Sequence, residues 1–201
     1  MTKKIILAVI CGVLAGYFLL PSTYTEQYLW LSEKLLIVGL CFLLFFVGID
    51  LGMDGSVVSN FKKVGWRIII FPIAIVVGTL AATAVASLLL PISVREGMAV
   101  GAGFGWYSLA PVMLSKYSAE LSAISFMHNV MRELFAIILI PIVAKKIGYI
   151  ESCSLPGAAA MDVCLPIVEA ATNANIAIYS FISGVALTIV VPILVPLVAG
   201  I

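Results

Sequence analysis

Residues 154–175 read SLPGAAAMDVCLPIVEAATNAN and carry two acids, Asp162 and Glu169, within an apolar stretch. Proline interrupts the helical hydrogen-bond pattern, so Pro166 predicts that this stretch does not form one regular helix. We therefore interpret Leu155–Ala171 as a broken or re-entrant half-helix segment, here called the second broken segment.

The composition is not that of a soluble protein. Of 201 residues, 63% are hydrophobic and 10% are charged, whereas a soluble domain is about a quarter charged. The sequence therefore predicts an all-α integral membrane protein in contact with the lipid bilayer. A net charge of +1 argues against a nucleic-acid partner. The four cysteines lack paired or metal-ligand spacing, so we expect no disulfide, no metal site and no cofactor.

Five apolar runs are long enough to span a bilayer, for which a helix needs about 17–25 residues. A shorter stretch, Met98–Leu114, reads MAVGAGFGWYSLAPVML and is interrupted by glycines and a proline; it is called the first broken segment. We expect a single membrane domain over residues 1–201, with three helices in 5–90 and then a broken segment plus a helix in 98–144 and again in 155–201. The five runs are Ile5–Leu20, Leu35–Met53, Val64–Leu90, Leu121–Ala144 and Ile176–Ile201.

The basic residues favour broken segments that enter and leave on the same side of the membrane. That arrangement places seven basic residues on the side of the N-terminus and three on the other side, whereas full crossings give six against four. Because cytoplasmic loops carry the excess of Lys and Arg, we predict a cytoplasmic N-terminus and an external C-terminus. The seven are Lys3, Lys4, Lys62, Lys63, Arg67, Lys145 and Lys146, and the three are Lys34, Arg95 and Lys116.

Each broken segment precedes a long apolar helix with a late proline, as in FAIILIPIVA and ALTIVVPILVPLV. Opposed, interrupted segments in corresponding positions indicate a transporter-like inverted repeat with a binding site where the segments meet. The alternative is that glycine and proline are simply common in membrane helices.

Intramembrane acids outnumber the bases in this sequence. The acids are Asp50, Glu133, Asp162 and Glu169, and Arg132 is the firm intramembrane base. A charged residue at the centre of a membrane helix costs about 2.5–3.5 kcal/mol, so each acid needs a partner, a wet cavity or a proton. The excess of acids predicts a cationic ligand or a titrating proton.

Asp162 is the strongest candidate for the site. Because Pro166 has no N–H, the carbonyl of Asp162 is expected to lie free beside its carboxylate, which suits an ammonium group or a proton. The alternative is that Asp162 caps a half-helix. Glu169 lies either in the site or at the membrane surface, and Asp50 is either a gating or coupling acid or a surface acid of low cost.

Residues 125–137, SFMHNVMRELFAI, place Asn129, Arg132 and Glu133 on one spanning helix. Helical spacing pairs Asn129 with both Arg132 and Glu133, and His128 with Arg132. Arg132 either neutralises another acid, holds a substrate carboxylate bidentately, or forms a structural ion pair. His128 is either a proton shuttle or a hydrogen-bonded fixture.

The first broken segment offers polar and aromatic groups to the same site. Gly103 and Gly105 permit close backbone approach, and Pro111 interrupts the helix. Tyr107 and Ser108 offer an aromatic face and hydroxyl groups to a cation. The alternative is an aromatic anchor at the membrane interface.

Four motifs, GAGFGWYSLAPVML, NVMRELFAIILIPIVAKK, GAAAMDVCLPIVE and VALTIVVPILVPLV, with LFFVGIDLG upstream, resemble the LysO-type lysine exporter family over nearly the whole chain. The resemblance implies export of L-lysine and lysine analogues across a bacterial inner membrane, with antiport of protons. It also implies distant similarity to inverted-repeat antiporter and bile-acid-transporter folds, with essential acids at Asp162 and Glu133. Many members carry an additional N-terminal membrane region, so the resemblance implies that a homodimer or a small companion membrane protein completes this chain.

Two other classes of function fit the sequence less well. An intramembrane protease needs a G-x-G-D element with facing aspartates, or a G-x-S-G serine with a base, and the sequence holds neither constellation, so we expect no enzyme activity. A non-transporting subunit, which depends on a partner in a larger membrane assembly, is the second hypothesis.

Overall fold

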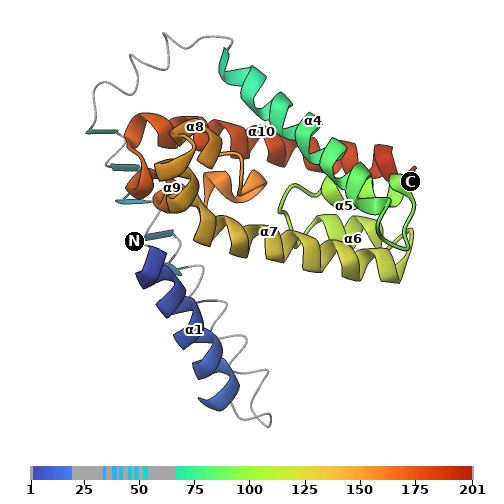
Figure 1. Ribbon diagram of the computed structural model, residues 1–201, viewed down its shortest axis with the longest axis horizontal. Coiled ribbons are helices and arrows are strands. Elements are labelled where there is room, and N and C mark those ends of the chain that lie inside the picture. The colour runs from blue at the N-terminus through green and yellow to red at the C-terminus, as the bar shows by residue number, and fades with distance from the viewer. Residues whose placement is uncertain are drawn as a thin grey trace.

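The computed structural model describes residues 2–19, 34, 38–39, 41–42, 45–46, 48–49, 52–53 and 67–200. Every regular element in this part of the chain is helical, which confirms the predicted all-α class (Figure 1). The elements are α1 (Thr2–Leu19), α4 (Arg67–Ser87), α5 (Val94–Gly101), α6 (Ala110–Leu114), α7 (Ala119–Lys146), α8 (Tyr149–Ser152), the 3₁₀ helix η2 (Gly157–Met161), α9 (Leu165–Ala171) and α10 (Ala174–Ala199).

Three helices in the described residues are long and apolar enough to cross a membrane: α4 from Ile69, α7 and α10. They coincide with the last three of the five predicted apolar runs, and α1 covers most of the first run. The run Leu35–Met53 lies largely outside the described residues, so the count of five spans stays a prediction.

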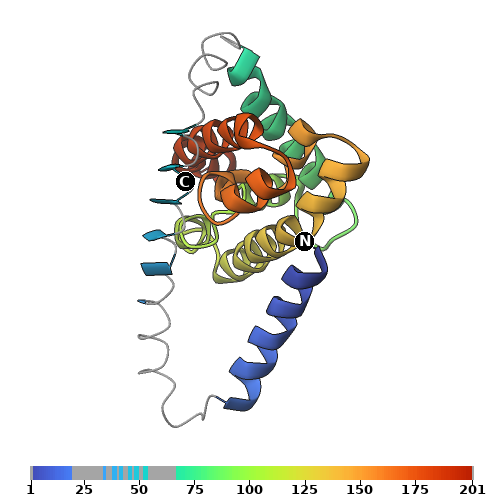
Figure 2. The ribbon, with the colours of Figure 1, turned by 90° about the vertical axis from the view of Figure 1, so that its left-hand side faces the viewer.

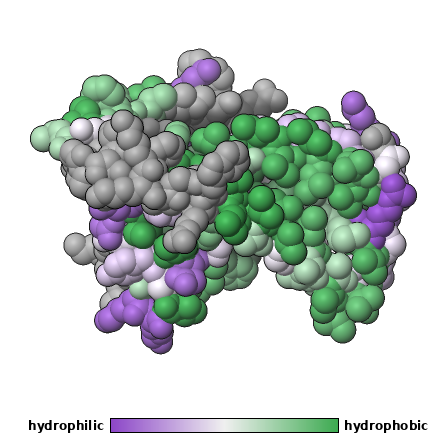
Figure 3. Space-filling model, turned by 90° about the horizontal axis from the view of Figure 1, so that it is seen from above, coloured by the Kyte–Doolittle hydropathy of each residue, from purple (hydrophilic) through white to green (hydrophobic). Residues whose placement is uncertain are grey.

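Hydrophobic residues cover much of the described surface on the face seen in Figure 3. On α10, Ile189, Ile193 and Leu197 are 61%, 64% and 71% exposed. Soluble monomers rarely expose contiguous apolar surface of this breadth. The surface therefore suits hydrocarbon rather than water.

Side-chain caps fix where the two longest helices begin. The Ser118 hydroxyl accepts the backbone N–H of Leu121 at 3.3 Å, at the start of α7. The Asn173 side chain accepts the backbone N–H of Ile176 at 3.1 Å, at the start of α10. Each cap satisfies an N–H that has no partner within its helix.

The short helix α5 begins with a capping box near one end of the bundle. The Glu96 carboxylate accepts the backbone N–H of Ser93 at 2.8 Å, and the Ser93 hydroxyl accepts that of Glu96 at 3.2 Å. The hydrogen bond from the Ser93 backbone lowers the pKa of Glu96 below its ordinary value. Nearby, Arg95 Nε donates to the carbonyl of Val198 at 2.8 Å, which joins α5 to the last turns of α10.

The two broken segments lie at opposite ends of the bundle that α4, α7 and α10 form (Figures 1 and 2). The first, Met98–Leu114, includes the end of α5, a turn and α6, and lies where α4 ends and α7 begins. The second, with η2 and α9, lies where α7 ends and α10 begins. Each segment enters and leaves the bundle at one end. The sides of the membrane on which the loops lie stay a prediction.

The turns of the two broken segments meet inside the bundle. The backbone N–H of Ala158 donates to the carbonyl of Phe104 at 2.7 Å. Gly157 has a φ of 69°, and a Cβ there would overlap this carbonyl oxygen. Gly105 has a φ of 93°, and a Cβ there would lie 2.8 Å from the carbonyl oxygen of Pro156. Both contacts require glycine, because a side chain would meet backbone at a disfavoured φ.

The prolines interrupt the two segments as predicted, but the backbone carbonyl of Asp162 does not lie free. Pro111 and Pro166 lie in the first turns of α6 and α9, where proline is tolerated because the N–H there has no helical partner. The prediction of a free Asp162 carbonyl is wrong, because this oxygen accepts the backbone N–H of Leu165 at 3.1 Å in a tight turn. Asp162 does not cap α9 either, since Cys164 occupies the capping position without a side-chain bond.

Candidate functional site

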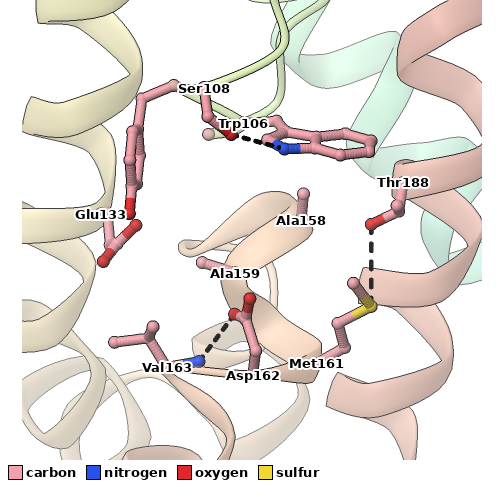
Figure 4. A pocket seen from close by; sticks show the side chains of 11 residues that line it. Trp106, Ser108, Glu133, Ala158, Ala159, Met161, Asp162, Val163 and Thr188 are labelled. Atoms are coloured by element: carbon pink, nitrogen blue, oxygen red, sulfur yellow. Dashed lines mark hydrogen bonds between the residues drawn. The ribbon is translucent and has the colours of Figure 1, made fainter. Parts of the chain in front are cut away.

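A cavity of about 120 Å³, here called the polar cavity, lies where the two broken segments meet α7 and α10 (Figure 4). Both broken segments and both of these helices contribute residues to its lining. The lining residues are Gly105, Trp106, Tyr107 and Ser108 of the first segment, Glu133 of α7, Ala158, Ala159, Met161, Asp162 and Val163 of the second segment, and Thr188 of α10.

Two carboxylates, Asp162 and Glu133, face this one cavity from different elements (Figure 4). The Asp162 carboxylate accepts the backbone N–H of Val163 at 2.6 Å, which fixes its orientation. Among the described residues that line the cavity, none is basic. Two acids in one cavity disfavour each other's charge, so the cavity favours a cation or a bound proton.

Aromatic and hydroxyl groups border the carboxylates. Trp106 Nε1 donates to Ser108 Oγ at 3.0 Å, which orients the hydroxyl group. Tyr107 is 40% exposed and packs edge-on against Phe126 of α7, with ring centroids 6.4 Å apart. The first segment thus supplies an aromatic face beside the acids, where the apolar stem of a cationic ligand can lie.

Asn129 holds the turn of the first segment and does not line the cavity. Its Oδ1 accepts the backbone N–H of Gly105 at 2.7 Å, and its Nδ2 donates to the carbonyl of Ser125 at 2.8 Å. A Cβ on Gly103 would lie 2.5 Å from Nδ2, so this glycine permits the contact. The predicted pairing of Asn129 with Arg132 and Glu133 is wrong, because the freed backbone of the turn takes up the amide instead.

Arg132 binds backbone rather than an acid in the described part of the chain. Its Nε donates to the carbonyl of Leu155 at 3.0 Å, and its terminal nitrogens lie 3.3 Å from the carbonyl of Ser154 and 3.4 Å from the Thr79 hydroxyl. Arg132 is absent from the cavity lining. The broken helix leaves carbonyl groups without helical partners, and the guanidinium satisfies two of them.

Of the remaining predicted residues, His128 and Glu169 do not line the polar cavity. His128 lines a separate apolar pocket between α4, α5 and α7. Glu169 belongs to α9 and is not part of the cavity lining. Asp50 lies outside the described residues.

Sequence reasoning did not find Thr188 or Met161. The Thr188 hydroxyl donates to the carbonyl of Gly184 at 2.8 Å and lies 3.7 Å from the sulfur of Met161. Thr188 stands in apolar surroundings in the sequence, and Met161, although it precedes Asp162, is itself apolar. Only the packing of α10 against η2 brings them to the cavity.

No three His, Cys, Asp or Glu side chains among the described residues are placed to hold a metal ion.

Comparison with known proteins identifies the family of the chain. A family model described as lysine exporter LysO matches residues 6–199, which is nearly the whole chain. The chain belongs to this family. It has 28% identity over 190 residues to the lysine exporter LysO of Escherichia coli K12, and 25% identity over 196 residues to a candidate lysine exporter of Haemophilus influenzae.

The LysO-family relatives differ in length. The aligned region covers 92% of this chain but 62% of the Escherichia coli protein, so the chain spans less than two thirds of that relative. It covers 96% of this chain and 95% of the Haemophilus influenzae protein. No solved structure matches the chain.

Proposed function

We propose that the chain is a secondary transporter that exports L-lysine and lysine analogues across a bacterial inner membrane in exchange for protons. The observation that carries this proposal is the polar cavity, in which two carboxylates and no described basic side chain converge between two broken segments. The names of the LysO-family relatives support lysine as the substrate.

The cavity offers what the end of a lysine side chain requires. Asp162 and Glu133 provide negative charge for an ammonium group, and Tyr107 provides an aromatic face for its methylene stem. A cavity of about 120 Å³ is slightly smaller than the 150 Å³ that holds one benzene molecule. It therefore takes the ammonium end of the substrate, and the remainder of lysine needs a more open state.

Exchange follows if the same carboxylates bind either the substrate or a proton. A charged acid without a partner is costly at this depth, so release of the lysine ammonium favours uptake of a proton. In the outward-open state the substrate leaves and a proton takes its place. In the inward-open state a new lysine displaces the proton, and this alternation is antiport.

The proposed architecture is an inverted repeat, with a cytoplasmic N-terminus and an external C-terminus. Its support is that the broken segments enter from opposite ends and meet at the cavity (Figure 1). Rocking of one segment and its long helix against the other opens the cavity to each side in turn.

A second candidate is a subunit that depends on a partner, either a second copy or a small companion membrane protein. The chain aligns with 62% of the Escherichia coli relative but with 95% of the Haemophilus influenzae relative, so the relatives themselves do not favour it. In such a subunit the polar cavity still binds lysine, but movement across the membrane needs the partner.

Counterflow of labelled L-lysine into proteoliposomes that hold the purified chain alone tests the proposal. We expect lysine-loaded vesicles to take up label, and an acidic exterior to accelerate efflux because protons enter as lysine leaves. The absence of counterflow by the chain alone, restored by a co-purified partner, would favour the second candidate. The absence of any lysine counterflow, with or without a partner, would contradict both.

A further inference from the structure

The chain contains two units whose helices begin 55 residues apart. The matching starts are Val94 of α5 and Tyr149 of α8, Ala110 of α6 and Leu165 of α9, and Ala119 of α7 and Ala174 of α10. The same spacing relates Ser118 and Asn173, which cap α7 and α10. Residues 94–144, the first unit, and residues 149–199, the second unit, therefore repeat one arrangement.

Side chains match at the same spacing. One pair of prolines begins α6 and α9, and another lies late in α7 and α10. Ser125 and Ser180 are both 0% exposed, so the spacing extends to the buried faces of the long helices. Identical pairs include Pro111 and Pro166, Ser125 and Ser180, Phe126 and Phe181, Pro141 and Pro196, and Ala144 and Ala199.

Each long helix also binds the turn of its own unit at equivalent backbone positions. In the first unit, Asn129 accepts the N–H of Gly105 at 2.7 Å. In the second unit, Ser180 donates to the carbonyl of Ala160 at 2.8 Å. Gly105 and Ala160 are again 55 residues apart, so the turns occupy equivalent places against α7 and α10.

The polar cavity lies between equivalent residues of the two units. Four pairs of its lining residues obey the spacing: Trp106 and Met161, Tyr107 and Asp162, Ser108 and Val163, and Glu133 and Thr188. Because α7 and α10 run in opposite directions (Figure 1), equivalent residues reach the cavity from opposite sides. Figure 4 shows this directly for Glu133 and Thr188.

We infer that the cavity consists of two equivalent half-sites, and that Thr188 contacts the substrate as the counterpart of Glu133. The inference rests on the proposed function and adds a residue to its site. The Thr188 hydroxyl donates its proton to the carbonyl of Gly184, which leaves oxygen lone pairs to accept from an ammonium group. A substrate ammonium between the units therefore meets Glu133 on one side and Thr188 on the other.

Equivalence predicts that the acid can be moved from one half-site to the other. Glu133→Thr alone should lower lysine counterflow about 10- to 100-fold, because it removes a charge-assisted hydrogen bond to the substrate ammonium. The exchange variant Glu133→Thr/Thr188→Glu should recover at least about tenfold over that single variant, because the carboxylate returns at equivalent depth. Since Thr188→Glu adds an acid to the unit that holds Asp162, counterflow is measured over a range of pH.

An exchange variant that folds, yet is no more active than Glu133→Thr at any pH, would overturn the inference while wild-type counterflow leaves the proposed function standing. Absence of lysine counterflow in the wild type, with or without a partner, would overturn both. If the exchange variant aggregates, Thr188→Val and Thr188→Ser provide a second test of the inference. Only the valine variant, which lacks the hydroxyl, should raise the KM for lysine by about tenfold. An unchanged KM in Thr188→Val would overturn the inference.

Discussion

Replacing Asp162 with asparagine should abolish exchange of lysine for protons while the protein still folds. The amide oxygen can still accept the backbone N–H of Val163, which the carboxylate accepts at 2.6 Å, so the local structure is retained. Loss of the charge removes a contact to the substrate ammonium worth about 1.5–3 kcal/mol, or roughly 10- to 100-fold in affinity. Because asparagine does not carry the exchangeable proton, efflux driven by a pH gradient should fall further still. Lysine efflux from proteoliposomes measures the effect.

A matched control separates this role from a general need for acids. Glu120 is exposed in the first turn of α7 and does not line the polar cavity. Glu120→Gln should therefore leave efflux unchanged, while Glu133→Gln should lower it. Wild-type efflux by a folded Asp162→Asn protein would refute the proposed site.

The second large effect is expected on stability, from Arg132→Met. Methionine keeps much of the side-chain volume but removes the donors that bind the carbonyls of Leu155 and Ser154. Each buried carbonyl left without a donor costs about 1–3 kcal/mol. We expect the free energy of unfolding to fall by about 2–5 kcal/mol, as measured by unfolding in a denaturing detergent.

Arg132→Lys is the control for this prediction. Lysine keeps the positive charge but has one donor group in place of the planar fork, so it should restore only part of the stability. If Arg132→Met were as stable as the wild type, Arg132 would not hold the second broken segment. If both variants kept their stability and lost lysine binding, a direct role with the substrate carboxylate would replace the present account.

The long helices and the two broken segments of this fold can be predicted from its sequence. The runs Leu121–Ala144 and Ile176–Ile201 lie within about two residues of α7 and α10, because uninterrupted apolar sequence of that length has one stable form in a bilayer. The two broken segments are signalled by glycine and proline, whose backbone limits act locally.

The partners of the polar side chains could not be predicted in the same way. Helical spacing suggested that Asn129 and Arg132 pair with neighbours on their own helix. Asn129 does bind Ser125 on its own helix. However, its Oδ1 and the Arg132 guanidinium bind backbone groups of the broken segments, 24 residues away for Gly105 and 23 residues away for Leu155. Those groups become available only because the segments are broken and folded back against α7. Thr188 was not predicted as a site residue because its place at the cavity also depends on packing between elements that are distant in the sequence.

Of the predicted site residues, the structure brings Asp162, Glu133, Tyr107 and Ser108 together with Gly105 at one cavity. The charge of an acid in apolar sequence was therefore a better guide than the spacing of polar neighbours. Burial of a carboxylate is costly wherever it occurs, whereas a hydrogen-bond partner is chosen by the whole fold.

The central claim is that one pair of carboxylates holds either a proton or the substrate ammonium. Mixing purified protein with L-lysine in a weakly buffered detergent solution, and recording proton release with a pH indicator dye, tests it most directly. The account predicts that lysine binding releases protons from the wild type, and that Asp162→Asn releases fewer or none. Saturable lysine binding to the wild type without proton release, at every pH where the protein is folded, would contradict it.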